Sequence, residues 1–206
     1  MLEPGDVHPA LAAVLTEQQP VAEHETAWMD GAMPLRVSAY AGEASVAGAA
    51  RLPLELVSSI RCIVRVGGKL LFCENRSSRH PWPGGRRIAG ESFADTAARE
   101  VHEETGWLIE RESLRGLGWL RLRHLGPEPD GNAGPYPDFL QLVFVAAAHG
   151  RDGGLPPDAE WTDVDGYELD SRLVTLDEAI ERTSTDMHAQ VFLRLLRGLG
   201  ETWTGY

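Results

Sequence analysis

Three glutamates, Glu100, Glu103 and Glu104, lie close together just after a glycine-rich stretch of the chain. If this segment is an α-helix, which advances about 100° per residue, the three carboxylates share one arc, beside the buried stripe that contains Ala97 and Val101. Like charges at these spacings repel one another. Mg²⁺ or Mn²⁺ would relieve the repulsion, because carboxylate oxygens suit these hard cations. The alternative is a solvated acidic helix face.

The longer segment 85–107 resembles the Nudix box. That pattern is a glycine, five residues, a glutamate, seven residues, Arg-Glu, an apolar residue, any residue, Glu-Glu, any residue, a glycine and an apolar residue. Two positions are unusual: Trp107 stands where a smaller aliphatic residue is commoner, and Ile88 stands where an acid is frequent. The matching positions are Gly85, Glu91, Arg99, Glu100, Val101, Glu103, Glu104 and Gly106.

The resemblance implies a fold and an activity. The fold would be the Nudix α/β/α sandwich, an α/β fold with a mixed sheet. The activity would be Mg²⁺- or Mn²⁺-dependent hydrolysis of a diphosphate linkage in a small nucleoside diphosphate compound. A Nudix-fold module that binds or regulates with weak or no catalysis is the alternative, but such modules usually lose a box acid, and none is lost here.

The resemblance also implies roles for individual residues. It makes Glu100 and Glu104 the leading metal ligands, followed by Glu103, with the Gly85 carbonyl as an additional ligand. It pairs Glu91 with Arg99, so that the turn is held against the helix. We assign catalytic roles to Glu100, Glu103 and Glu168. The general base stays open between Glu100 and the downstream acids Glu168, Asp130 and Asp138.

Four arginines form a basic island in a chain whose net charge is −12: Arg76, Arg79, Arg86 and Arg87. No acid occurs from position 75 to 89, and the island flanks the glycines next to the expected metal. Arginine binds phosphate oxygens through paired hydrogen bonds. We therefore predict these arginines as substrate contacts, with a solvated basic loop as the alternative.

Two aromatic residues are candidates for stacking on a base or another planar group. Trp82 precedes the glycines, and Tyr136 borders a loop rich in proline and glycine. Packing beneath their loops is the alternative for each.

The composition excludes several classes of protein. A net charge of −12 argues against binding to long nucleic acids or anionic membranes. No apolar run is long enough to span a bilayer, and no signal peptide is visible, so we expect a cytoplasmic protein. Cys62 and Cys73 would face each other across a hairpin that turns at Gly67-Gly68, and we expect two reduced thiols in the core.

The expected elements divide the 206 residues into an N-terminal extension, 1–55, and a Nudix domain, 56–206. Ser92 is expected to cap the box helix in a Ser-x-x-Asp capping box with Asp95, and Gly106 to end the helix. In the domain we predict strands at 56–66, 69–74, 117–125, 139–147 and 169–174, and further helices at 176–182 and 186–199.

The extension is predicted to hold a helix at 9–19, a strand at 33–41 and a loop at 42–50. It has too few apolar residues for a core of its own, so its strand needs a partner in the Nudix sheet or in a second subunit. We expect a homodimer with this segment near the interface; a monomer whose extension wraps its own domain is the alternative.

Overall fold

The computed structural model describes residues 7–28, 32–75, 81–128, 130–131, 134–163, 166 and 168–200. By its internal contacts the chain forms two units. Unit 1 comprises Met1–Ser59 and Leu117–Leu142, and unit 2 comprises Ile60–Gly116 and Val143–Tyr206. Strands β3 (Val57–Val66) and β7 (Asp138–Arg151) each contribute residues to both units.

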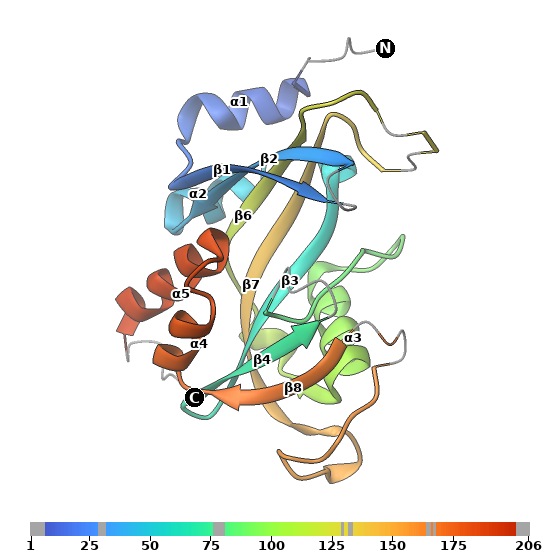
Figure 1. Cartoon of the computed structure of the whole chain (residues 1–206), viewed down its shortest axis with the longest axis vertical. Helices are drawn as coiled ribbons and strands as arrows, with labels where there is room; N and C mark the ends of the chain where they lie inside the picture. Colours follow the sequence, from blue (N-terminus) through green and yellow to red (C-terminus); the bar gives the residue numbers. More distant parts are fainter. Residues whose placement is uncertain are drawn as a thin grey trace. The chain divides into compact units, whose positions relative to one another are not determined.

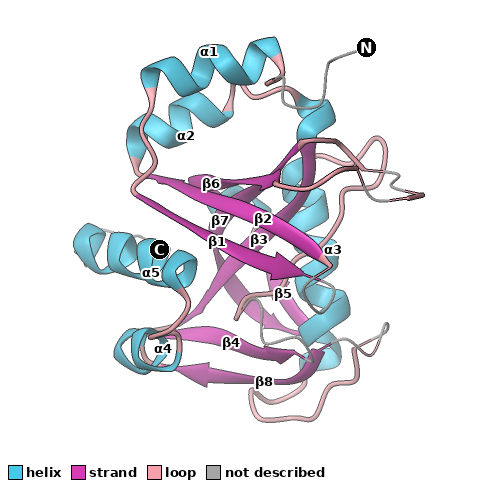
Figure 2. Ribbon diagram, turned by 45° about the horizontal axis from the view of Figure 1, so that its top comes forward, coloured by secondary structure: helices cyan, strands magenta, loops and turns pink. Residues whose placement is uncertain are grey.

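Unit 1 is an antiparallel sheet covered by two helices. Strand β1 (Ala22–Trp28) pairs with β2 (Met33–Ala41), and β2 pairs with β6 (Arg115–His124) over seven residue pairs. Figure 2 shows helices α1 (Pro9–Glu17) and α2 (Glu43–Ala49) side by side over these strands. Alternate residues of β2, Leu35, Val37 and Ala39, are buried. The unit's apolar core also includes Leu11, Val14, Leu122 and Leu140.

The predicted strand at 33–41 is confirmed with its bounds, and its partner is β6 of the same chain. The loop expected at 42–50 is wrong, because Glu43–Ala49 is helical. Its small residues let α2 approach the end of α1 closely. The Gln18 side chain donates to the Ala44 carbonyl (2.6 Å) and occupies the space beside Gly48, where a Cβ atom would lie 2.0 Å from Gln18 Nε2.

The sheet of unit 2 has the strand order β7-β3-β4-β8, and the short β5 (Trp107–Ile109) pairs with β7. The hairpin of β3 and β4 (Lys69–Asn75) turns at Gly67-Gly68 as predicted, since Val66 pairs with Lys69. Cys62 and Cys73 on these strands are buried and form no disulfide. Strand β8 (Glu168–Val174) pairs with β4.

Three helices belong to unit 2. In Figure 1, α3 (Phe93–Thr105) lies on one side of its strands, and α4 (Leu176–Arg182) and α5 (Met187–Leu199) lie on the other. The predicted helices match these bounds, with Asp186 as the N-cap of α5. Short 3₁₀ turns complete the described elements: η1 (Leu54–Leu56), η2 (Arg111–Ser113) and η3 (Asp152–Gly154).

Candidate functional site

The glycine turn of the box lies along strand β3. The amide of Cys62 donates to the Pro83 carbonyl (2.9 Å), and the amide of Ile60 donates to the Gly85 carbonyl (3.0 Å). Between them, the Arg61 side chain donates from Nη1 to the Gly84 carbonyl. Gly84 has φ +148°, and a Cβ atom there would lie 2.3 Å from the Ile60 carbonyl oxygen. The close approach of turn and strand therefore requires glycine.

The same turn contacts helix α3 through two of the predicted ligands. The Gly84 amide donates to Glu104 Oε2 (2.9 Å). A Cβ atom at Gly85 would lie 2.5 Å from both Glu100 carboxylate oxygens, so the lack of a side chain at Gly85 makes room for this carboxylate. Gly85 and Glu100, fifteen positions apart in sequence, are thus brought together.

Helix α3 begins and ends where its local signals predict. The Ser92 hydroxyl accepts from the Asp95 amide (3.1 Å), and Gly106 ends the helix with φ +70°. The return half of the predicted capping box differs, because the Asp95 carboxylate accepts from the Ser92 hydroxyl (2.6 Å) and not from the backbone amide. The Ser92 hydroxyl still satisfies the Asp95 amide, one of the first-turn amides that have no partner within the helix.

The acids are less uniformly placed than the helical wheel predicted. Glu100 is only 9% exposed and lies within the buried face, whereas the Glu103 side chain is 41% exposed. The expectation that Glu100 lies beside the buried stripe, and not within it, is therefore wrong. The reason is Thr96, which is fully buried although polar and extends the buried face to the side of Glu100 away from Ala97.

Arg99 organises the acids around one guanidinium group. It pairs with Glu91 through Nε (2.8 Å) and Nη2 (3.1 Å), which confirms the predicted pair. Nη1 donates both to Glu100 Oε1 (2.9 Å) and to Glu103 Oε2 (3.0 Å), and Nη2 also donates to the Arg86 carbonyl (3.0 Å). All five N–H groups of the guanidinium are thereby used.

The surroundings of Glu91 and Glu100 shift the pKa values of these two carboxyl groups in opposite directions. The hydrogen bond from Arg99 lowers the pKa of Glu91 to about 2, and the Ile88 amide and Thr96 hydroxyl add to the effect. Burial raises the pKa of Glu100 above its ordinary value, although Arg99 and Arg61 act to lower it. A cation bound beside Glu100 would lower this pKa and favour the carboxylate form.

The arrangement of these carboxylates can be compared with the ligands that a divalent cation needs. Among the described residues no group of three or more histidine, cysteine or acidic side chains converges on a metal position. Two carboxylates, those of Glu100 and Glu103, do converge, and the position they share is taken by Arg99 Nη1. The Glu104 carboxylate lies against the same turn through its bond from the Gly84 amide. The donor set suits Mg²⁺ or Mn²⁺ once Nη1 withdraws.

Of the predicted basic island, the described part is Arg86 and Arg87, while Arg76 and Arg79 lie outside the described residues. The side chain of Arg86 is exposed. Arg87 is held in place, because its guanidinium lies 4.9 Å from the centre of the Phe93 ring and donates to the Glu91 carbonyl (3.2 Å). Arg86 is therefore the more available of the two for an anionic ligand.

The two predicted stacking residues have different surroundings. Trp82 is 4% exposed, and its ring packs edge-on against Phe192 of α5. Tyr136, in unit 1, is partly exposed; its hydroxyl donates to the Gly126 carbonyl (3.0 Å) and its ring contacts His124. The surroundings of Trp82 are those of a core aromatic, whereas Tyr136 is partly exposed.

The three downstream acids predicted as candidates for the general base lie in different surroundings. Glu168 begins strand β8, where it pairs with Asn75. Asp138, in unit 1, is 2% exposed and held by Arg121 (2.7 Å) and Arg123 (3.1 Å). Asp130 is exposed. Both oxygens of the Asp138 carboxylate are thus engaged by arginine side chains.

Two residues of this region had no sequence signal. Arg61 reaches the turn from β3, where it is one of two arginines in a largely apolar strand. Trp161 donates from its indole nitrogen to the Glu103 carbonyl (3.0 Å), and its ring fills the space beside Gly106. Both contacts join segments far apart in the chain.

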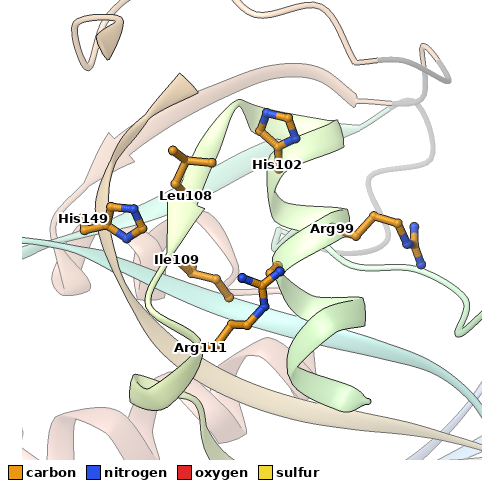
Figure 3. A pocket seen from close by; sticks show the side chains of 7 residues that line it. Arg99, His102, Leu108, Ile109, Arg111 and His149 are labelled. Carbon is orange, nitrogen blue, oxygen red and sulfur yellow. The ribbon is translucent and has the colours of Figure 1, made fainter. Parts of the chain in front are cut away.

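A hollow is lined by residues of α3, β5, η2 and β7 (Figure 3). Arg99 contributes to its rim, but its side chain extends away from the other labelled residues. Arg111 is paired with Asp95 (3.1 Å), and His102 is paired with Asp152 (3.4 Å). The lining residues are Ala98, Arg99, His102, Leu108, Ile109, Arg111 and His149.

The fold and the site together define a class: an α/β domain in which a glycine turn meets a helix that carries paired carboxylates. Comparison with known families agrees, since the model of the NUDIX domain matches residues 56–196, more than half of the chain. The chain belongs to the Nudix family.

Solved structures resemble the chain at the level of fold. A mutant of the Bacillus subtilis pyrophosphohydrolase BsRppH is 20% identical, with a TM-score of 0.56 over 86% of this chain and 98% of that one. A Nitrosomonas europaea NUDIX hydrolase is 20% identical, with a TM-score of 0.42 over 64% of this chain and 80% of that one. The Bacillus halodurans MutT protein is 20% identical, with a TM-score of 0.44 over 65% and 78%.

The first of these likenesses confirms the predicted Nudix α/β fold. Strands β1 and β2 precede the matched domain. No curated protein sequence gives a significant match. In the part of the chain that the structure describes, every helix is too short or too polar to cross a membrane.

Proposed function

We propose that this chain is a hydrolase that uses Mg²⁺ or Mn²⁺ to cleave a diphosphate linkage in a small nucleoside diphosphate compound. The observation that carries the proposal is the position shared by Glu100 and Glu103, whose oxygens lie 2.9 and 3.0 Å from one nitrogen of Arg99. Two carboxylates around one cationic atom, beside a glycine turn, form a site to which a divalent ion and a pyrophosphate can be added.

Glu100, Glu103 and Glu104 would hold the cation, with the Gly85 carbonyl as an additional ligand. The Gly85 oxygen accepts one hydrogen bond, from Ile60, and keeps a second lone pair. When bound, such a cation neutralises phosphate charge and lowers the pKa of the attacking water. Arg99 would keep its two bonds to Glu91 and give up those from Nη1.

The chain's own groups supply the remaining requirements. A carboxylate must accept the proton of the attacking water; Glu100, Glu103 and Glu168 are the proposed candidates. Arg86 is exposed next to the turn and suits a phosphate oxygen. Arg76, Arg79, Arg87 and Tyr136 remain predicted substrate contacts, whereas the burial of Trp82 favours the alternative of packing beneath its loop.

A second reading follows from the same contacts. Every box acid already has a partner in the chain: Glu91, Glu100 and Glu103 bind Arg99, and Glu104 binds the Gly84 amide. A chain that keeps these contacts with ligand bound would be a binding or regulatory module. The two functions differ in whether a bound ligand is hydrolysed.

The deciding experiment is a panel of nucleoside diphosphate compounds, each incubated with the full chain and Mg²⁺ and assayed by phosphatase-coupled release of phosphate. The hydrolase proposal predicts turnover of at least one compound and its loss with EDTA. Glu181→Gln, at an exposed glutamate of α4, is the matched control and should retain the activity. Binding of a compound by calorimetry without turnover would favour the binding module.

A further inference from the structure

Three consecutive carbonyls of the glycine turn are fixed to three consecutive residues of strand β3. Those of Pro83 and Gly85 accept ordinary backbone hydrogen bonds from Cys62 and Ile60. The carbonyl between them, at Gly84, is bound by the Arg61 guanidinium. A side chain therefore completes the attachment of the turn.

The Gly84 residue is held from both sides. Its amide donates to Glu104 on helix α3 (2.9 Å), and its carbonyl accepts from Arg61 on strand β3. Movement of this residue would shift the neighbouring Gly85, which lies against the Glu100 carboxylate. Arg61 also interacts electrostatically with Glu100. One arginine thus acts on the turn and on a proposed metal ligand.

We propose that Arg61 is a positioning residue, which fixes the Gly84 carbonyl and thereby sets the glycine turn against Glu100 and Glu104. The inference rests on the proposed function only for its kinetic consequence. Reacting groups must be held closely, and a displacement of about 1 Å can cost about 100-fold in rate. A residue that acts through the turn, without touching substrate, should affect kcat more than KM.

The test replaces Arg61→Met, which keeps an unbranched stem and removes the guanidinium. Arg65→Met is the matched control, because Arg65 lies four residues along the same strand, next to the hairpin turn. Hydrogen exchange of the amides in residues 84–91 reports on the turn without any substrate. We expect faster exchange in Arg61→Met than in the wild type, and wild-type exchange in Arg65→Met.

Kinetics on a compound found in the panel supply the second measurement. We expect kcat of Arg61→Met to fall about 10- to 100-fold with KM changed less than about 3-fold. Arg61→Lys, which keeps a cationic donor, should recover part of kcat. Should Arg61→Met fail to fold, Arg61→Gln takes its place, because its shorter amide cannot keep the same contact.

The results separate the two proposals. If the wild type hydrolyses nothing, the proposed function fails, and the exchange experiment still judges the role of Arg61. Unchanged exchange in a folded Arg61→Met would overturn the positioning role. If Arg65→Met lost as much amide protection and kcat as Arg61→Met, the effect would reflect the general stability of strand β3 and the positioning role would be wrong. An effect of Arg61→Met confined to KM would make Arg61 a substrate contact instead.

Discussion

Arg99 and Glu91 form a two-bond ion pair across eight residues of sequence, with distances of 2.8 and 3.1 Å. The pair joins the loop before helix α3 to the middle of the helix. Glu91 is 20% exposed, and its second oxygen also accepts from the Thr96 hydroxyl (2.9 Å). The pair therefore fixes the loop in place before any ligand binds.

This pair should contribute a pH-dependent part of the stability. Because the pKa of Glu91 is lowered to about 2 from 4.5, its contribution is complete above about pH 4.5 and is lost as the pH falls toward 2. Thermal melting of the wild type and of Glu91→Gln measures it. The variant should melt lower at pH 7, and the difference should close between about pH 4.5 and 2. A difference that stays constant over that range would contradict the assignment.

Arg86 should contribute more to substrate binding than Arg87. Arg86 is exposed, whereas Arg87 already contacts Phe93 and the Glu91 carbonyl. We expect Arg86→Ala to raise KM several-fold with little change in kcat, and the double variant with Arg87→Ala to raise it further and to melt lower. A wild-type KM in the double variant would indicate that both residues belong to a solvated basic loop and do not contact the substrate.

The two thiols should be inert in the folded protein. Burial raises the pKa of Cys62 to about 12, and Cys73 is also buried. The thiolate is the reactive form, so a thiol reagent at pH 8 should label neither residue in the native chain and both in denaturant. Rapid labelling of the native protein would show that this hairpin opens readily.

The sequence predicted those helices and strands whose signals lie within or directly beside the element. Ser92 and Gly106 are local signals, and the helix between them was predicted with its bounds. Strand 33–41 was also predicted, because its alternating pattern is local. Strand β1 was not predicted, because its residues Ala22–Trp28 are mostly polar and lie at the sheet edge.

Within the site, the pairing of Glu91 with Arg99 was predicted from the resemblance to the Nudix box, and the structure has it. Contacts that depend on tertiary packing were not predicted. The wheel could not show that Thr96 would be buried and would bring Glu100 into the buried face. The approach of Arg61 to Gly84 depends on how the turn lies along β3, which residue types alone do not encode.

The N-terminal extension should be needed for the fold of unit 1. Strand β2 pairs with β6 over seven residue pairs, and a chain that begins at Pro53 would leave that edge of β6 open. We predict that the full chain is a homodimer by light scattering and that the shortened chain aggregates or melts lower. A full-length monomer at micromolar concentration would contradict the dimer. A stable shortened dimer would place the interface elsewhere.

We propose above that the box carboxylates act on a bound divalent ion during hydrolysis. Glu100→Gln tests it most directly, because it removes one charge at a buried position and keeps nearly the same shape. At saturating Mg²⁺, on a compound that the wild type cleaves, we predict a loss of about 100- to 1,000-fold in kcat with the fold intact by circular dichroism. Glu104→Gln should behave similarly, and Glu181→Gln should match the wild type. Wild-type turnover in both Glu100→Gln and Glu104→Gln would contradict the account.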